Sequence, residues 1–420
     1  MPDRGKHHQR VPPAATETIP LGRTRSLEET EGAVLRIQNR IPISRISDLT
    51  PLDRLGLPVY SVTTPLARDL TTHLGKGMDD AAARVSALME AVERVSAEEP
   101  PPGTVEAASF HQLTGRGELA LDAEDFDLPT GSTWDRESEF NWVPAELRHW
   151  GRPSERALLP ADLAISPPRE GLLDAVDTNG LAAGNDLVEA AVHGVCEVVE
   201  RDAQGQLEFQ GLHGGAGEFL PKPQVVDPTS LPAPAATWVS HIEDHGLSTV
   251  LHDLTGDIRV PGFRALILDP AYPTPTGLEP RVFAGWGTSL NPGVAVMRAV
   301  SEAVQSRLGV VQGARDAWNA TAFDRRAATR EGRLQAWRSE PEVAFEDTAA
   351  ARAADTAVTP AEKLEALQER LAAVGLERLV IVDLTRPDLD IAVVRVRVPG
   401  LSSFLVNRRR VGWRCLRHLL

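Results

Sequence analysis

Three stretches of the chain combine an apolar helical pattern with a narrow polar stripe, and this combination constrains the fold more than any other feature. Positions i, i+4 and i+7 of a helix point to the same side, because each residue turns the helix by about 100°. The three stripes are Ser86, Glu90 and Glu93; Glu189, His193, Glu197 and Glu200; and Arg298, Glu302 and Gln305.

The rest of each helix is built for burial. Apolar residues cover the other sides of the first two helices: Val85, Leu88, Met89 and Val92, and Ala190, Val192, Val195 and Val199. Carboxylates at i and i+3 repel one another, and an unpaired carboxylate on a buried helix costs several kcal/mol. The stripes therefore require a nearby positive charge.

Two sources of positive charge are open. Arg94 and Arg201 directly follow acidic pairs, but adjacent helical residues diverge by about 100° and need not face the same way. A divalent cation is the other source, and carboxylates without a His/Cys cluster suit Mg²⁺ better than zinc. A single such stripe is usually a solvated or arginine-paired face, whereas its recurrence on three helices favours a metal site.

Composition and charge exclude several classes of protein. The chain has 420 residues and a net charge of −15, which disfavours general nucleic-acid binding. Its two cysteines, Cys196 and Cys415, cannot form a disulfide framework or a multi-cysteine zinc site, and they fit a reducing cytoplasm. The first 24 residues lack the apolar core of a secretory signal and are expected to form a disordered tail. No stretch is long and apolar enough to span a bilayer.

The pattern along the chain favours one α+β domain over residues 25–420, with helices packed on mixed sheet. Helices are expected at 28–39, 75–99, 187–204, 294–313 and 361–375, and strands at 58–62, 248–255, 263–269, 377–384 and 391–398. Residues 103–170 suggest short strands and loops. The charged stretch 314–358 is expected to be helical and to lie on the surface.

Magnesium held by carboxylates commonly also holds substrate phosphates. The familiar nucleotide-binding motifs are absent, however. The GKG at Gly75 is followed by Met78 and lacks the preceding P-loop glycine, and NGLAAGN at Asn179 does not fit GxGxxG. The spacing alone thus predicts an acidic magnesium site that binds a nucleotide through an unusual cradle.

At this point the chain resembles the YcaO superfamily. Three ordered signatures carry the resemblance, together with TPLDRLGLPV and the late VPGL: Ser86-x-x-x-Glu90-x-x-Glu93-Arg94; Asn179-Gly-Leu-Ala-Ala-Gly184-Asn185-x-x-x-Glu189-Ala, which ends in Glu197-x-x-Glu200-Arg201-Asp202; and Arg298-Ala-Val-Ser-Glu302-Ala-Val-Gln305-Ser-Arg307. The resemblance runs from about Arg25 to the end of the chain.

The resemblance implies an α+β fold of its own kind, with mixed sheets, buried acidic helices and an ATP site without a P-loop. It implies that magnesium is held by five carboxylates: Glu90, Glu93, Glu189, Glu197 and Glu200. It places Ser86 and Asn185 at the nucleotide and Arg298 or Arg315 at phosphate oxygens. Glu302 and Gln305 occupy signature positions, RSLEET adds Arg25 and Thr30, and Lys76 is carried over as a further nucleotide contact.

The resemblance also implies an activity. Members of this family use ATP to activate a peptide-bond amide, which gives an azoline, a thioamide or an amidine, and no catalytic nucleophile from the enzyme is needed. The short segment before Arg25 and a C-terminus without proline are typical of the stand-alone type that works with a TfuA-like partner. We therefore expect sulfur to replace an amide oxygen in a precursor peptide, with a separate sulfur donor.

Three alternatives are kept. One is azoline formation from Cys, Ser or Thr, another is a non-catalytic ATP-binding scaffold, and the last is an ordinary ATP-dependent ligase. The basic stretch NRRRVGWRCLRH could dock an acidic partner or peptide, although a solvated helix or a homodimer contact fits it equally well.

Overall fold

The computed structural model describes residues 23–213, 223–274, 277–278, 281–313, 341–417 and 419. Most of its helices begin at a residue whose polar side chain caps the helix N-terminus, such as Ser26, Asp79 or Asn291. The α-helices are α1 (Leu27–Arg36), α2 (Asp80–Ser96), α3 (Phe110–Gly115), α4 (Leu187–His213), α5 (Ala233–Asp244), α6 (Pro292–Gln312), α8 (Ala349–Arg352), α9 (Pro360–Ala373) and α10 (Trp413–Leu416).

The strands form three sheets and one short hairpin, all mostly antiparallel. The first sheet has the order β1-β2-β3, the second β13-β10-β9-β8-β14, and the third β4-β5-β15-β16-β7 with β6 paired to β5. Their bounds are β1 (Arg45–Asp48), β2 (Val59–Thr63), β3 (Thr72–Lys76), β4 (Val105–Ala108), β5 (Phe140–His149), β6 (Glu155–Pro160), β7 (Leu181–Gly184), β8 (Gln224–Val226), β9 (Ser248–Asp253), β10 (Gly262–Asp269), β11 (Pro273–Thr274), β12 (Gly277–Leu278), β13 (Arg281–Thr288), β14 (Glu342–Val343), β15 (Arg378–Asp383) and β16 (Ala392–Arg397).

Each striped helix directly follows a strand of a different sheet. The pairs are β3 with α2, β7 with α4, and β13 with α6. In the first and third pairs a strand glycine lets the helix backbone approach closely. A Cβ at Gly75 would lie 2.2 Å from the Ala83 oxygen, and one at Gly287 would lie 2.2 Å from the Ala295 oxygen. In both pairs the alanine stands eight positions after the glycine, so the two helices are seated in the same register.

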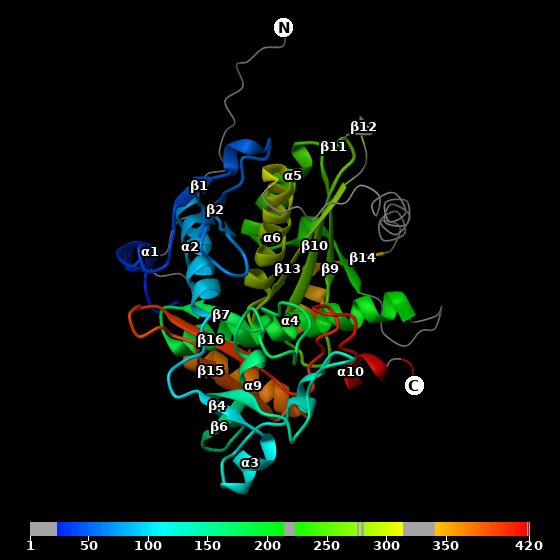
Figure 1. The fold of residues 1–420 in the computed structure, drawn as a ribbon. Helices are drawn as coiled ribbons and strands as arrows, with labels where there is room; N and C mark the ends of the chain where they lie inside the picture. The colour runs from blue at the N-terminus through cyan, green and yellow to red at the C-terminus, as the bar shows by residue number, and fades with distance from the viewer. Residues whose placement is uncertain are drawn as a thin grey trace.

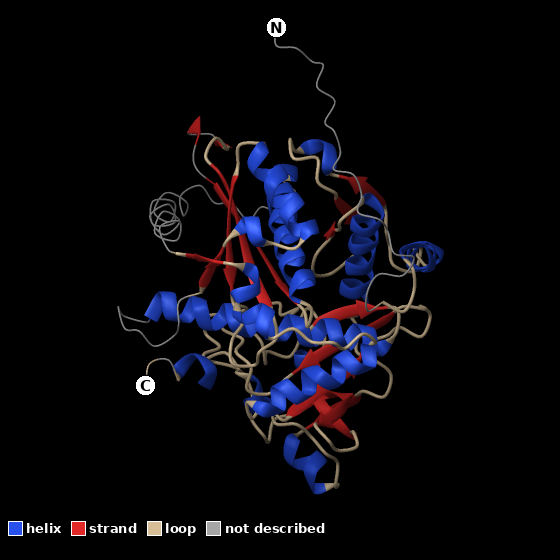
Figure 2. Ribbon diagram, turned by 180° about the vertical axis from the view of Figure 1, so that it is seen from behind, coloured by secondary structure: helices blue, strands red, loops and turns tan. Residues whose placement is uncertain are grey.

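The three helices meet in the middle of the molecule. In Figure 1, α2 and α6 stand upright side by side, and α4 lies across beneath them; the view from behind in Figure 2 shows the same arrangement. Separate apolar cores pack α2 and α1 on one face of the third sheet, α4 and α9 on its other face, and α5 and α6 on the second sheet. The arrangement leaves the polar stripes directed toward the junction of the three helices.

Buried ion pairs join segments that are distant in sequence. The Arg307 guanidinium donates to Asp53 and Asp269 at 2.8 Å, and both aspartates are buried. Asp177 accepts hydrogen bonds from Arg397 and Arg410, and burial, which would raise its pKa, is outweighed by these arginines, so that its pKa is lowered. These ion pairs link distant loops to α6, through Arg307, and to β16, through Arg397.

Most of the expected elements are confirmed, including the striped helices and the strands at 248–255, 263–269, 377–384 and 391–398. The mixed α+β class is also confirmed. The helical expectation is wrong for 341–358, where β14, a 3₁₀ turn and the short α8 occur, and the remainder of that stretch, 314–340, lies outside the described residues. Helix α5 was not expected, because its sequence APAATWVSHIED follows several prolines that suggest a loop.

Candidate nucleotide and magnesium site

Most of the residues around the polar stripe of each helix are buried, whereas most of the stripe itself is partly exposed. On α2, the residues around the stripe are fully buried, including Ala87, Leu88 and Ala91, whereas Glu90 and Glu93 are half-buried. The stripes of α4 and α6 show the same contrast at His193, Glu197 and Glu200 and at Arg298, Glu302 and Gln305, whereas Glu189 is buried. Apart from Glu189, the carboxylates are therefore neither scattered into solvent nor sealed in the core.

Carboxylates of α2 and α4 approach one another. Burial raises the pKa of Glu93 well above its ordinary value, and the charges of Glu197 and Glu90 raise it further. One oxygen of Glu93 accepts a hydrogen bond from the Ala183 N–H of β7 at 3.1 Å. Burial likewise raises the pKa of Glu197 to about 7, against the opposing effect of Arg201. Negative charge is thus concentrated between α2 and α4 without full compensation.

Carboxylates of α4 and α6 form the second part of the same site. Burial raises the pKa of Glu200, and the neighbouring charge of Glu302 raises it further. Burial also acts to raise the pKa of Glu302, but the ammonium group of Lys76 donates a hydrogen bond to it and lowers its pKa on balance. Lys76 comes from β3, so four elements contribute charged groups to this acidic cluster, which we define as Glu90, Glu93, Glu197, Glu200 and Glu302.

The arginines next to the acidic pairs neutralise the cluster only in part. Arg94 turns away and pairs with Asp69 at 2.9 Å. Arg201 lies 3.9 Å from Glu197, at the limit of an ion pair, and donates a longer hydrogen bond of 3.4 Å to Gln204. These two described arginines therefore do not by themselves account for the stripes, which favours a further cation at the cluster.

The donor set fits magnesium that arrives with a nucleotide. Within the described residues, no three His, Cys, Asp or Glu side chains gather closely enough to hold an ion by themselves. Mg²⁺ typically takes one or two carboxylates and completes its shell with water and substrate phosphates. A loose ring of carboxylates from separate helices is the arrangement that such shared coordination requires.

Glu189 differs from the other predicted metal ligands. Its carboxylate is 1% exposed and accepts hydrogen bonds from Arg23 Nη1 at 2.8 Å and from the Thr24 N–H at 2.9 Å. The Asn185 side-chain amide donates to both of its oxygens at 3.2 Å, and Thr30 Oγ1 donates to Asn185 Oδ1 at 2.9 Å. Burial acts to raise the pKa of Glu189, but the charge of Arg23 together with the hydrogen bonds from Arg23, Thr24 and Asn185 outweighs it, and the pKa is lowered.

This hydrogen-bond network brings together the predicted metal ligand Glu189, the predicted nucleotide contacts Asn185 and Thr30, and two residues that the sequence did not suggest. Arg23 and Thr24 were placed in the disordered tail, and the structure corrects its last two positions because they are tied to Glu189. Nothing in the sequence near Arg23 signals this contact, since its partner is 166 residues away.

The other predicted residues of α6, Arg298 and Gln305, donate hydrogen bonds to carbonyl groups of neighbouring strands. Arg298 donates to the Thr288 carbonyl at 3.4 Å, and Gln305 donates to the Leu74 carbonyl at 3.3 Å. Burial lowers the pKa of His193 well below its ordinary value, and the charges of Arg23 and Arg298 lower it further, so its imidazole is neutral.

Ser86 lies on the same helix side as the cluster, whereas Arg25 lies apart from it. Ser86 is half-buried on α2, one turn before Glu90. Arg25 donates to the Asp390 carbonyl at 3.4 Å and pairs with its carboxylate at 3.5 Å, away from the acidic cluster. Arg315 lies outside the described residues.

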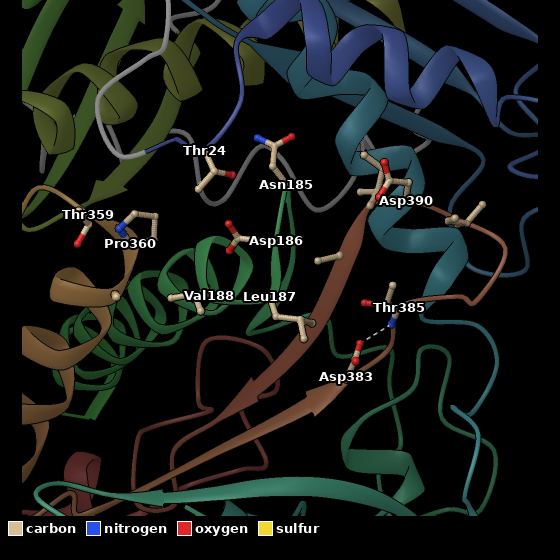
Figure 3. A pocket seen from close by; sticks show the side chains of 14 residues that line it. Thr24, Asn185, Asp186, Leu187, Val188, Thr359, Pro360, Asp383, Thr385 and Asp390 are labelled. Atoms are coloured by element: carbon tan, nitrogen blue, oxygen red, sulfur yellow. Dashed lines mark hydrogen bonds between the residues drawn. The ribbon is translucent and has the colours of Figure 1, made fainter.

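A pocket of about 630 Å³ adjoins the Glu189 network. Figure 3 shows Asn185 and Asp186 at the start of α4, with Thr359 at the start of α9 across the opening and Asp383 and Asp390 on the side of β15 and β16. Its lining includes Asn185 but none of the residues of the acidic cluster. The pocket therefore meets the predicted nucleotide site at Asn185 and is separate from the acidic cluster.

Comparison with known proteins supports the assignment of these residues to one family. The model of a family described as YcaO cyclodehydratase, ATP- and Mg²⁺-binding, matches residues 74–402. A protein of Methanothermobacter thermautotrophicus of unknown role is 37% identical over 384 residues, which cover 89% of this chain and 93% of that protein. Another relative, from Rhizobium leguminosarum bv. trifolii and described as lying in the tfuA 3′ region, is 33% identical, with 86% of this chain and 84% of the relative covered.

A solved structure extends the likeness to three dimensions. The YcaO protein of Methanopyrus kandleri, bound with AMPPCP and Mg²⁺, superposes with a TM-score of 0.69 at 25% identity, covering 93% of this chain and 95% of that one. Within the described residues, no helix is both long and apolar enough to cross a membrane. The family model spans most of the chain and its description agrees with the acidic cluster built above: the chain belongs to the YcaO family, whose members bind ATP and Mg²⁺.

Proposed function

We propose that this protein uses ATP to activate a backbone amide of a ribosomally made peptide and replaces the amide oxygen with sulfur. The observation that carries the proposal is the convergence of carboxylates from α2, α4 and α6 on one confined space. In a family that binds ATP and Mg²⁺, such a space is suited to hold the metal-bound phosphates.

Each predicted residue receives a role in this proposal. Glu90, Glu93, Glu197 and Glu200 would hold magnesium, with Glu302 beside them. Lys76, Arg298 and Gln305 surround the same space, and their cationic or amide groups would meet phosphate oxygens. Ser86, Asn185 and Thr30 would contact the remainder of the nucleotide. The roles of Arg25, Arg315 and of Glu189 as a metal ligand stay predictions, and the saturated carboxylate of Glu189 favours a positioning role for it.

The chemistry follows from the poor leaving ability of an amide oxygen. A sulfide adds to the carbonyl carbon, and the resulting oxyanion attacks the γ-phosphate of ATP, which releases ADP. Loss of phosphate from the tetrahedral intermediate then leaves a carbon–sulfur double bond, so the products are a thioamide, ADP and inorganic phosphate. The protein's part is to orient the reactants and balance the charge that develops, as in other phosphoryl transfers. Magnesium supplies charge neutralisation on the phosphates when it is bound.

Sulfur as the nucleophile is favoured by the relative in the tfuA 3′ region, which covers most of this chain. A TfuA-like protein is accordingly the proposed partner, together with a precursor peptide and a sulfur donor. The runner-up is azoline formation, which the cyclodehydratase description of the family supports. In that reaction a Cys, Ser or Thr side chain of the peptide replaces sulfide.

The deciding experiment is mass spectrometry of the peptide after reaction with the enzyme, ATP, Mg²⁺, sulfide and the TfuA-like protein. We expect a mass gain equal to the exchange of one oxygen for one sulfur, and ADP as the nucleotide product. Loss of one water would instead assign azoline formation, and AMP as product would assign an ordinary ligase. The Glu93→Gln variant, which keeps the shape of the side chain, should give none of these products, and the exposed control Glu369→Gln should react normally.

A scaffold without catalysis is the remaining alternative. It predicts that the protein binds Mg²⁺-ATP and yet turns over none of it, even with the peptide and the partner present. All the signature carboxylates are present in the sequence, which argues against a degenerate site.

A further inference from the structure

Helix α10 is mounted with its polar side inward and its apolar side outward. Arg414 and Cys415 are buried against α4, whereas Trp413 is 64% exposed and Leu416 is 40% exposed. Val411, just before the helix, is 39% exposed. We call these three exposed side chains, Val411, Trp413 and Leu416, the α10 surface. A helix that packs on its own protein normally shows the opposite polarity.

The inward side of α10 is held by ion pairs of Arg414 and Arg417 and not by apolar contacts alone. Arg414 donates to both oxygens of Asp202 at 2.8 and 3.0 Å and to Asp257 at 2.7 Å. Arg417 donates to Asp257 at 2.9 Å and to Gln206 at 2.8 Å. Asp202 is almost fully buried, so these bonds fix the orientation of the helix. The tryptophan is therefore presented outward by a rigid mount and not by a loose chain end.

The α10 surface is flanked by basic side chains. Arg408 and Arg409 are 56% and 57% exposed, although each also contacts an acidic neighbour, Glu208 and Asp174 respectively. A second copy of this chain whose two-fold axis passed close to these arginines would bring the same arginines against each other, which is unfavourable. A different protein with an apolar socket and carboxylates at its rim would match both features.

We propose that the α10 surface is the docking site for the partner protein, whose complementary surface is an apolar socket for Trp413 with an acidic rim facing Arg408 and Arg409. Exposed tryptophans on rigid mounts are common anchors of protein interfaces. The proposal rests on the proposed function for the identity of the partner, a TfuA-like protein. Because Asp202 lies two positions after Glu200 on α4, the docking site and the acidic cluster share one helix.

The test measures binding of a purified TfuA-like protein to the full-length chain by isothermal titration calorimetry. Trp413→Ser and Leu416→Ser should each weaken binding at least tenfold. Both variants should keep the wild-type unfolding curve and Mg²⁺-ATP affinity, because both side chains are exposed and neither belongs to a buried apolar cluster or to the acidic cluster. The matched control is Trp150→Ser: Trp150 is 40% exposed at the end of β5 and should bind as the wild type does.

The acidic rim has a separate readout. Raising the salt concentration should weaken binding of the wild type, and the double variant Arg408→Ser/Arg409→Ser should show a smaller salt dependence. The proposal is overturned if the two α10 variants bind as tightly as the wild type, if the wild type does not bind the TfuA-like protein, or if sedimentation shows that Trp413 holds two copies of this chain together. Tight binding through Trp413 without any thioamide product would keep the docking site and reject the proposed function, so the two failures are distinguishable.

Discussion

Replacing Glu197 by glutamine should make the ligand-free protein more stable at neutral and alkaline pH. The pKa of Glu197 rises from its ordinary value of 4.5 to about 7, chiefly through burial. Below pH 4.5 the side chain is protonated in both the folded and the unfolded states and costs nothing. Between pH 4.5 and about 7 only the unfolded state loses the proton, so the wild type loses stability as the pH rises through this range.

The size of the effect follows from the same pKa. A tenfold change in proton affinity corresponds to about 1.4 kcal/mol, so the full rise is equivalent to about 3 kcal/mol. The Glu197 side chain is 28% exposed, and water therefore screens part of the cost. We expect Glu197→Gln to raise the free energy of unfolding by about 1–2 kcal/mol at pH 8 and by close to zero at pH 4.5.

The assay is urea unfolding of the wild type and the variant at several pH values, without nucleotide or metal and with a chelator present. The exposed control Glu369→Gln should leave stability unchanged at every pH. Adding Mg²⁺-ATP should stabilise the wild type more than Glu197→Gln, because the variant loses a proposed ligand. A variant that is less stable than the wild type at pH 8, or a gain that does not change with pH, would refute the argument that Glu197 carries an uncompensated charge.

Three further predictions concern other parts of the structure. Lys76→Met should raise the KM for ATP about tenfold in steady-state ATPase assays, because Glu302 loses the cation beside it; an unchanged KM would remove Lys76 from the site. Arg307→Met should lower the free energy of unfolding by about 3–5 kcal/mol in urea titrations, because two buried aspartates lose their shared partner; a loss below 1 kcal/mol would contradict this. Gly75→Ala should lower the free energy of unfolding by about 2–3 kcal/mol in the same assay, because the added Cβ would lie 2.0 Å from a backbone nitrogen of α2. The control Gly256→Ala should be neutral, because nothing lies within 4 Å of its added Cβ. Equal effects of the two substitutions would show that α2 can shift.

The acidic cluster could be predicted from the sequence because helical spacing is a local property. Glu90, Glu93, Glu197 and Glu200 fall on one side of their helices whatever the tertiary structure does, and burial of the other sides follows from the apolar residues at most of the remaining positions. That the stripes face one another is a hypothesis based on recurrence, and the effects of their charges on one another's pKa values support it.

The network around Glu189 could not be predicted in the same way. Glu189 has the same spacing as Glu197, yet Asn185 and Thr24 satisfy its oxygens, because the chain segment before α1 returns to the start of α4. Helical spacing gives the side of a helix but not what approaches that side. The reversed polarity of α10 was hidden for a similar reason: its arginines look solvent-exposed in the sequence, and only the distant Asp202 draws Arg414 inward.

The long-range ion pairs also determine how the chain can reach its native state. Arg307 and Asp53 are 254 residues apart, and Arg414 and Asp202 are 212 residues apart. Closing such large loops before the contacts form is entropically expensive. Folding should therefore be slow, and these ion pairs should form late in the process. Until both ends of the polypeptide have emerged from the ribosome, Asp53 and Asp202 must stay hydrated, and the surfaces that later enclose them remain open to chaperones.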